Sequence, residues 1–179
     1  MLLKRNYEIS HLQEVVSLYP KVDELQLQTM LFAFGLLQAL VDSGLTFCFK
    51  GGTSLLLLLE SPKRVSTDID IVVPRKTNFD RYFDLVKDRF PFYRGEERGA
   101  TNNHSFRHFY FHPKSIPGSD RLKINLDVAF EDDPFLETAE KEIAKPFLLT
   151  DGNKALLRSL LCPHSSEINS PLLRLTRLG

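Results

Sequence analysis

The sequence lacks an excess of charge of either sign, because its 23 lysines and arginines equal its 23 aspartates and glutamates. Zero net charge does not indicate a nucleic-acid partner for the chain as a whole, so any basic binding surface must be local. Internal repeats and low-complexity tracts are also absent, and the hydrophobic fraction is an ordinary 42%. These features argue against disorder and predict one globular domain, with room for a short appendage.

Cysteine is scarce, with only Cys48 and Cys162 in 179 residues. Cys48 lies in an apolar run, so we expect a buried thiol without a disulfide, which fits a reducing cytoplasm. Long apolar runs are absent as well, and the longest, at residues 30–37, is far too short to span a bilayer. The charged N-terminus is not followed by an apolar stretch, which argues against a signal peptide. We therefore expect a cytoplasmic protein with no membrane partner.

Apolar periodicity predicts alternating helices and strands along the chain. Asp23 and Gln26 resemble a capping box at the start of a long helix, and Ser43-Gly44 resembles its stop. The predicted helices cover residues 8–18, 23–42, 53–60 and about 13 residues after Asn78, and the predicted strands cover residues 45–50, 68–73, 105–112 and 121–130. This order predicts an α/β (α+β) fold with a small mixed β-sheet flanked by helices.

Two carboxylates lie two residues apart at the start of the strand predicted over residues 68–73. Asp68 and Asp70 point to the same face, because side chains alternate along a strand. The pair would repel unless a cation lies between them, and Mg²⁺ takes such oxygen ligands together with substrate phosphates. Gly51 and Gly52, at the start of a predicted helix, offer unencumbered N–H groups to an anion. Together these features predict phosphoryl or nucleotidyl transfer.

A third carboxylate comes from the strand predicted over residues 121–130. Lys123, Asn125 and Asp127 share one face of that strand by alternation. If this strand neighbours residues 68–73, Asp127 completes a triad able to hold two Mg²⁺ ions roughly 3.5–4 Å apart. Asn125 and Glu131 are nearby polar alternatives to Asp127 for this role.

Further candidates would bind the phosphates of a nucleotide. Thr53 or Ser54 follows the glycine pair, while Arg64 and Lys123 supply positive charge. The Ser66 hydroxyl faces the same side as Asp68 if the strand begins that early. Lys123 has an equal alternative interpretation as a solvated strand residue.

Each of these features, taken alone, is more often structural than functional. A lone glycine pair is most often a turn, and a lone Asp-x-Asp is usually on the surface. Their joint occurrence in a strand, glycine pair, helix, strand order favours a site, because buried unpaired carboxylates are costly. His104, His108 and His112 are interpreted as strand surface, because residues four apart on a strand are roughly 13 Å apart and cannot converge on one ion.

These residues resemble the AbiEii group of abortive-infection nucleotidyltransferase toxins, from type IV toxin–antitoxin systems within the polymerase-β-like nucleotidyltransferase superfamily. Three blocks carry the resemblance. They are Gly51-Gly52-Thr53-Ser54-Leu55, then Arg64-x-Ser66-x-Asp68-Ile69-Asp70, and, more loosely, Lys123-x-x-x-Asp127. The resemblance covers roughly residues 25–148.

The resemblance implies an NTP–Mg²⁺ donor, an RNA (possibly tRNA) or protein acceptor, and a cognate antitoxin. It implies the polymerase-β-like fold, with a nucleotidyltransferase core over residues 1–150 and a short tail over residues 151–179 in place of a longer helical half. Asp68 and Asp70 would bind both metal ions, and Asp127 would serve as ligand and as general base for the acceptor hydroxyl. Two alternatives stay open: a catalytically weak nucleotide-binding or interaction module, and a metal-dependent nuclease.

Overall fold

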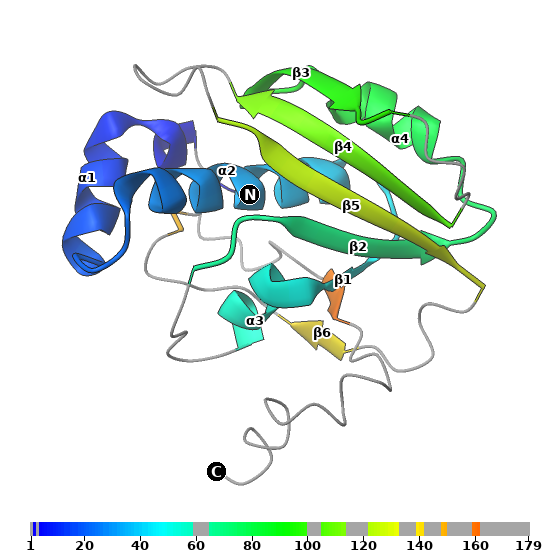
Figure 1. The fold of residues 1–179 in the computed structure, drawn as a ribbon, viewed down its shortest axis with the longest axis horizontal. Helices are drawn as coiled ribbons and strands as arrows, with labels where there is room; N and C mark the ends of the chain where they lie inside the picture. Colours follow the sequence, from blue (N-terminus) through cyan, green and yellow to red (C-terminus); the bar gives the residue numbers. More distant parts are fainter. Residues whose placement is uncertain are drawn as a thin grey trace, which may run out of the picture.

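A computed structural model describes residues 2, 4–58, 65–99, 105–113, 122–132, 139–141, 148–149 and 159–161 of the chain. The strands form one mixed sheet in the order β3-β4-β5-β2-β1-β7-β6 (Figure 1). The strands are β1 (Cys48–Lys50), β2 (Ile69–Pro74), β3 (Phe92–Glu97), β4 (Phe106–Pro113), β5 (Ile124–Glu131), β6 (Ala139–Lys141) and β7 (Ser159–Leu161). β2 and β5 run parallel at the centre, while β3, β4 and β1 pair antiparallel with their neighbours on β4, β5 and β2. The predicted mixed α/β sheet is confirmed.

Four α-helices and a short 3₁₀ helix are described around the sheet. They are η1 (Lys4–Tyr7), α1 (Ile9–Leu18), α2 (Glu24–Asp42), α3 (Gly51–Leu58) and α4 (Phe79–Val86). The predicted start of α2 is confirmed, because the Asp23 carboxylate accepts a hydrogen bond from the Gln26 N–H at 3.1 Å. Its predicted stop is also confirmed, because Gly44 follows Ser43 with a φ of +81°.

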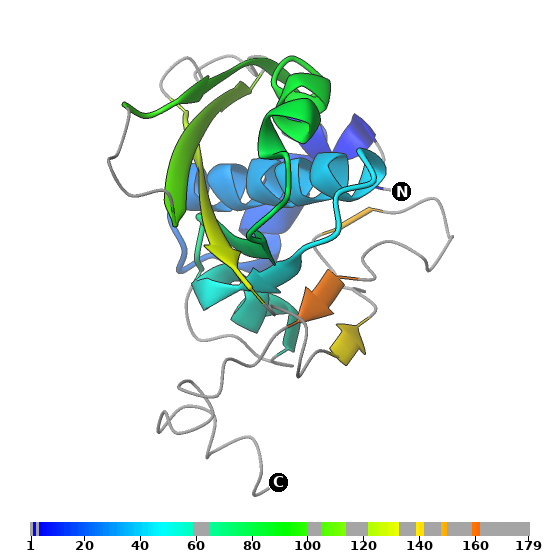
Figure 2. The same ribbon diagram turned by 90° about the vertical axis from the view of Figure 1, so that its right-hand side faces the viewer.

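The long helix α2 lies against one face of the sheet, and the sheet curves around it (Figure 2). Ile69, Ile71 and Val73 of β2 point to this inner face and are fully buried. By length and composition α2 is apolar enough to cross a membrane, but 72% of its most apolar window is buried inside the protein. Such burial is typical of a core helix, so α2 forms the centre of the hydrophobic core.

Alternation along β5 separates the core from the polar side of the sheet. Ile124, Leu126 and Val128 are fully buried on the inner face, while Asn125 and Asp127 on the opposite face are partly exposed. We call this second side, turned away from α2, the outer face. A one-residue shift in register would exchange the two sets, so burial of the apolar residues also fixes the direction of Asp127.

Several elements differ from the sequence prediction: β3, β6 and β7 were not predicted, and β1 and α4 are shorter than expected. Strand β3 was not predicted, because Phe92–Glu97 is a charged edge segment that lacks regular apolar alternation. Helix α4 is eight residues long instead of about thirteen. A turn follows it, in which the Arg89 N–H binds the Val86 carbonyl, and Pro91 disfavours helical geometry at the preceding residue.

The C-terminal segment and Cys48 also differ from the sequence prediction. Strand β7, within the predicted tail, pairs with β1, so this part of the tail belongs to the sheet. Cys48 is buried as expected, but it is disulfide-bonded, and the expectation of a free thiol is wrong. Burial does not distinguish the two states, because thiols and disulfides are both apolar. The other cysteine, Cys162, lies outside the described residues, and cysteine usage gives no support to a reducing compartment.

Candidate active site

Asp70 and Asp127 lie side by side at the centre of the outer face. They are register partners in the parallel pair of β2 and β5, so their side chains leave the sheet on the same side. Parallel neighbours are about 4.8 Å apart, which places two carboxylates within mutual electrostatic reach. The predicted adjacency of these two strands is confirmed.

Asp68 lies at the same end of the sheet, one residue before β2 begins. It is exposed, and its Oδ1 accepts a hydrogen bond of 3.0 Å from the Asn125 side-chain amide. Asn125 therefore orients Asp68 rather than replacing Asp127. Within the part of the chain that the structure describes, no three Asp, Glu, His or Cys side chains meet in a metal-binding arrangement. The three-carboxylate metal site stays a prediction.

Gly51 brings the start of α3 directly against Asp70. Its φ is +76°, a backbone conformation that favours glycine. A Cβ built on Gly51 would lie 1.9 Å from Asp70 Oδ2 and 2.7 Å from Asp70 Cγ, far inside van der Waals contact. Glycine is therefore needed at position 51 for two reasons: the turn requires a positive φ, and the Asp70 carboxylate occupies the space of a Cβ. The sequence predicted only the first. Gly52 follows as the second residue of α3.

The hydroxyls near the glycine pair are engaged within the fold. Thr53 is fully buried, and its hydroxyl donates to the Asp68 carbonyl at 2.5 Å and lies 3.0 Å from the Ser66 hydroxyl. The Ser54 hydroxyl donates to the Gly51 carbonyl at 2.7 Å. Thr53 thus fastens α3 to the start of β2, which positions the glycines beside the carboxylates. The main-chain N–H groups at the start of α3 remain the better candidates for phosphate binding.

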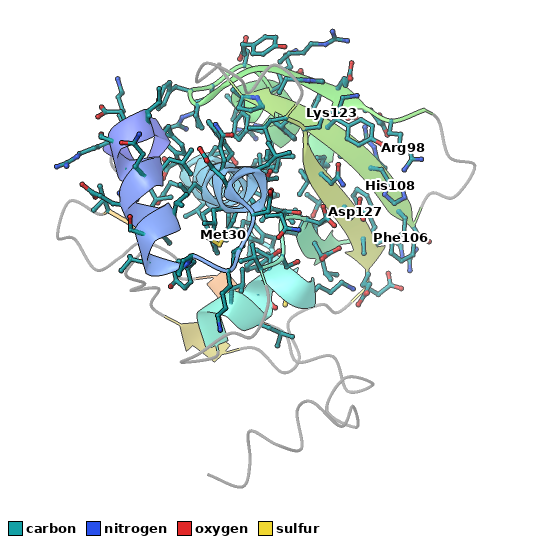
Figure 3. The ribbon with its side chains drawn as sticks, turned by 60° about the vertical axis from the view of Figure 1, so that its left-hand side comes forward. Met30, Arg98, Phe106, His108, Lys123 and Asp127 are labelled. Atoms are coloured by element: carbon teal, nitrogen blue, oxygen red, sulfur yellow. The ribbon has the colours of Figure 1, made fainter. Side chains whose placement is uncertain are left out.

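His108 is a member of this site that the sequence interpretation missed. It is the register partner of Asp127 across the β4–β5 pair, and its Nδ1 lies 2.7 Å from Asp127 Oδ1. Figure 3 shows both residues on the outer face, away from Met30 of α2. His112, two residues beyond Tyr110 on the same strand, has a different partner and hydrogen-bonds Glu96 at 3.0 Å.

Strand alternation indicates which face of β4 carries His108, but the contact with Asp127 can be predicted only when the register between β4 and β5 is known. Alternation alone places His108 and His112 on one face of β4, without showing which neighbour each one meets. The hydrogen bond from His112 lowers the pKa of the Glu96 carboxyl, with a smaller contribution from Arg94. His104 lies outside the described residues.

Two lysines lie on or beside the strands of the candidate site. Lys50 is the register partner of Asp70 on β1, although its ammonium lies 3.7 Å from Glu131. Lys123 is exposed, and its Nζ lies 5.3 Å from the centre of the Tyr110 ring. Arg64, the other predicted phosphate ligand, lies outside the described residues.

The residues present fit a hard divalent cation. Their donors are carboxylate oxygens on adjacent strands, which is the ligand chemistry that Mg²⁺ prefers. A small buried cluster of Cys48, Val72 and Ala129 borders the carboxylates on the same face. This apolar border lowers the local dielectric constant on one side and strengthens interactions between the carboxylates and a cation.

Comparison with known proteins places the chain in a family. Residues 35–157, more than half of the chain, match the family described as "Nucleotidyl transferase AbiEii toxin, Type IV TA system". No curated protein matches the sequence.

Two solved structures match the chain at low sequence identity. One is MenT4, the nucleotidyltransferase toxin Rv2826c from Mycobacterium tuberculosis H37Rv, with 16% identity, a TM-score of 0.52, and coverage of 93% of this chain and 59% of that one. The other is a putative nucleotidyltransferase from H. pylori, with 19% identity, a TM-score of 0.43, and coverage of 61% and 49%. This chain thus spans about half to three-fifths of the length of the structures it matches. From the family match, the chain belongs to the AbiEii nucleotidyltransferase toxins of type IV toxin–antitoxin systems.

Proposed function

We propose that this chain transfers a nucleoside monophosphate (NMP) group from an NTP to a hydroxyl group of an RNA or protein acceptor. The proposed cofactor is a divalent cation, most simply Mg²⁺. The observation that carries the proposal is the in-register pair of Asp70 and Asp127 on adjacent parallel strands, with the Gly51 main chain against Asp70. Family membership supports the reaction class.

Asp70 and Asp127 are the proposed cation ligands, with Asp68 as a third ligand if it leaves Asn125. When bound by these carboxylates, such a cation would neutralise phosphate charge and would lower the pKa of a coordinated acceptor hydroxyl. The start of α3, from Gly51, presents main-chain N–H groups that would hold the terminal phosphates of the NTP. Lys123 offsets negative charge near the carboxylates, and Arg64 is proposed for the same role.

Proton transfer is assigned to Asp127, with His108 as its positioning residue. The acceptor oxygen attacks the α-phosphorus, the bond to the β-phosphate bridging oxygen breaks, and pyrophosphate leaves. The proton from the acceptor hydroxyl passes to Asp127. Because His108 Nδ1 lies 2.7 Å from Asp127 Oδ1, His108 serves as a positioning residue that holds the carboxylate in orientation.

The proposal is tested with the full chain, Mg²⁺ and each NTP in two labelled forms, carrying ³²P at the α or the γ position. Bulk RNA and a mixed protein extract serve as separate acceptors. We expect α-label on one acceptor and γ-label released as pyrophosphate. A nuclease would instead shorten the RNA without pyrophosphate, and a binding module would bind NTP in calorimetry without transferring label.

The decisive variant replaces both β2 carboxylates, as Asp68→Ala with Asp70→Ala. We expect a loss of transfer of about 10³-fold or more, because cation binding and charge stabilisation are both removed. The matched control is Asp84→Ala with Asp88→Ala, two exposed carboxylates of the α4 region. Equal transfer by the two double variants would show that the proposed mechanism is wrong.

The family also suggests a biological setting. Membership in type IV toxin–antitoxin systems suggests a cognate antitoxin, an abortive-infection role and a cytoplasmic site of action. A neighbouring reading frame that relieves growth arrest on co-expression supports the antitoxin. Growth arrest by the parent but not by the Asp68 and Asp70 double variant would tie toxicity to the carboxylates.

A further inference from the structure

Beside the carboxylates, the outer face carries an aromatic ring between two cations. Tyr110 of β4 is the register partner of Asn125 on β5, and it is partly exposed. The Arg98 guanidinium carbon lies 5.9 Å from the centre of the Tyr110 ring, and Lys123 Nζ lies 5.3 Å from it. Figure 3 shows Arg98 and Lys123 on the same side of the sheet as Asp127.

Both cations are available to an incoming ligand. Arg98 and Lys123 are exposed, and neither forms an ion pair with any residue that the structure describes. Other arginines of these strands are committed, since Arg94 pairs with Glu96 and Arg107 pairs with Glu97. The ring and these two cations, which pair with no carboxylate in the described part of the chain, therefore form a local basic and aromatic surface on a chain of zero net charge.

The position of this surface relative to the carboxylates determines which substrate it meets. Tyr110 and Asp127 are diagonal neighbours on adjacent strands, about 7–8 Å apart. The strand order places the start of α3 near β1 and β2, on one side of the carboxylate pair, and Tyr110 on β4, on the other side. In an in-line displacement the attacking and leaving oxygens lie on opposite sides of the phosphorus. If pyrophosphate leaves toward α3, the acceptor approaches over β4.

We propose that Tyr110, Arg98 and Lys123 form a stacking subsite for an unpaired nucleobase next to the reacting end of a single-stranded polynucleotide acceptor. This proposal rests on the proposed function. Stacking of a base on an aromatic side chain strengthens binding about 5- to 150-fold. An exposed cation–π contact contributes only about 2- to 5-fold. A base can therefore displace a cation from the ring, and the cation can then pair with an adjacent phosphate.

The same strands offer little to a peptide acceptor in extended form. Main-chain groups of β4 are already paired with β3 on one side and β5 on the other, so no free edge is present for strand addition there. The outer face of β4 presents side chains alone. Sheet faces with exposed aromatic rings and nearby cations match the recognition of splayed, unpaired bases.

The test measures binding of a fluorescein-labelled 12-nucleotide single-stranded RNA to the full chain by fluorescence anisotropy, without NTP. Tyr110→Leu should weaken binding about 10- to 100-fold, because the ring is lost while apolar bulk is kept. Tyr110→Phe should bind within about 3-fold of the parent, because the stacking face remains. Arg98→Ala and Lys123→Ala should each reduce the slope of log K against log salt by about 0.7.

A matched control uses a second ring and lysine pair that lies off the outer face. Phe90 is exposed, Lys4 Nζ lies 5.5 Å from the centre of its ring, and it contacts Tyr7, which stacks on Phe32 of α2. Phe90→Leu should leave RNA binding unchanged. Thermal unfolding of each variant confirms that the fold is retained.

The outcomes separate this proposal from the proposed function. Unchanged binding by Tyr110→Leu, or equal affinity for a duplex of the same length, would overturn the subsite. Label transferred only to protein, without RNA binding by the parent, would overturn it while leaving the transferase activity in place. RNA binding that depends on Tyr110, without any nucleotide transfer, would support the stacking subsite and would contradict the proposed transferase activity.

Discussion

Gly51 provides the sharpest test of the carboxylate geometry, through the substitution Gly51→Ala. An alanine there must adopt a φ of +76°, which costs roughly 1–2 kcal/mol of folding stability for an L-residue. Its Cβ would also lie 1.9 Å from Asp70 Oδ2. Contact at an ordinary distance needs more than 3 Å, so the Asp70 carboxylate must move by about 1 Å.

The cost of this movement falls on catalysis more than on folding. The displaced atoms are at the end of a flexible side chain, so rotation of Asp70 relieves most of the clash. A misplacement of about 1 Å in a catalytic group can lower the rate about 100-fold, which corresponds to roughly 2.7 kcal/mol in the activation barrier. We therefore expect Gly51→Ala to lose about 100-fold in transfer of α-labelled NTP.

Gly44→Ala is a matched control within the same chain. Gly44 has a φ of +81°, but a Cβ built on it meets nothing within 4 Å. Urea unfolding should show similar losses of stability for both variants, while only Gly51→Ala loses transfer activity. Equal activity in the two variants would refute the conclusion that the fit of Asp70 against Gly51 is needed for the reaction.

Three further substitutions test other contacts of the site and the fold. His108→Ala should lower the transfer rate about 10- to 100-fold, because it removes the group that orients a proposed metal ligand, with little change in melting temperature. Thr53→Val should cost about 1 kcal/mol in urea unfolding, because it removes the hydrogen bond that the buried Thr53 hydroxyl donates to the Asp68 carbonyl. Thr29→Val should cost less than about 0.5 kcal/mol, because that exposed hydroxyl bonds only its own helix. Glu97→Gln should cost about 0.5–1 kcal/mol at pH 7, because the hydrogen bond from Arg107 lowers the pKa of the Glu97 carboxyl. That stabilisation is fully present above the ordinary glutamate pKa of about 4.3 and is lost as the pH falls through the lowered folded-state pKa. The stabilities of parent and variant should therefore converge in acid. A constant difference in stability down to about pH 2 would contradict the assignment.

Local patterns predicted the elements whose signals are carried by neighbouring residues. The Asp23 cap and the Gly44 stop bound α2 as expected, and alternation on β5 set Asp127 apart from its buried neighbours. Strand β3 was missed because an edge strand can be short and charged, with its burial decided by the strand beside it. The predicted length of α4 was wrong because its periodicity continued beyond the turn that ends the helix.

The sequence by itself determined the chemical types at the site: two carboxylates two residues apart, a third on a later alternating strand, and a glycine pair before a helix. These follow from side-chain periodicity and backbone freedom, which are properties of short segments. Only the tertiary structure decided the partners. The parallel register set Asp127 beside Asp70, the antiparallel register set His108 beside Asp127, and the approach of α3 set Gly51 against Asp70. Register is fixed by burying apolar residues from distant segments together, and no single segment holds that information.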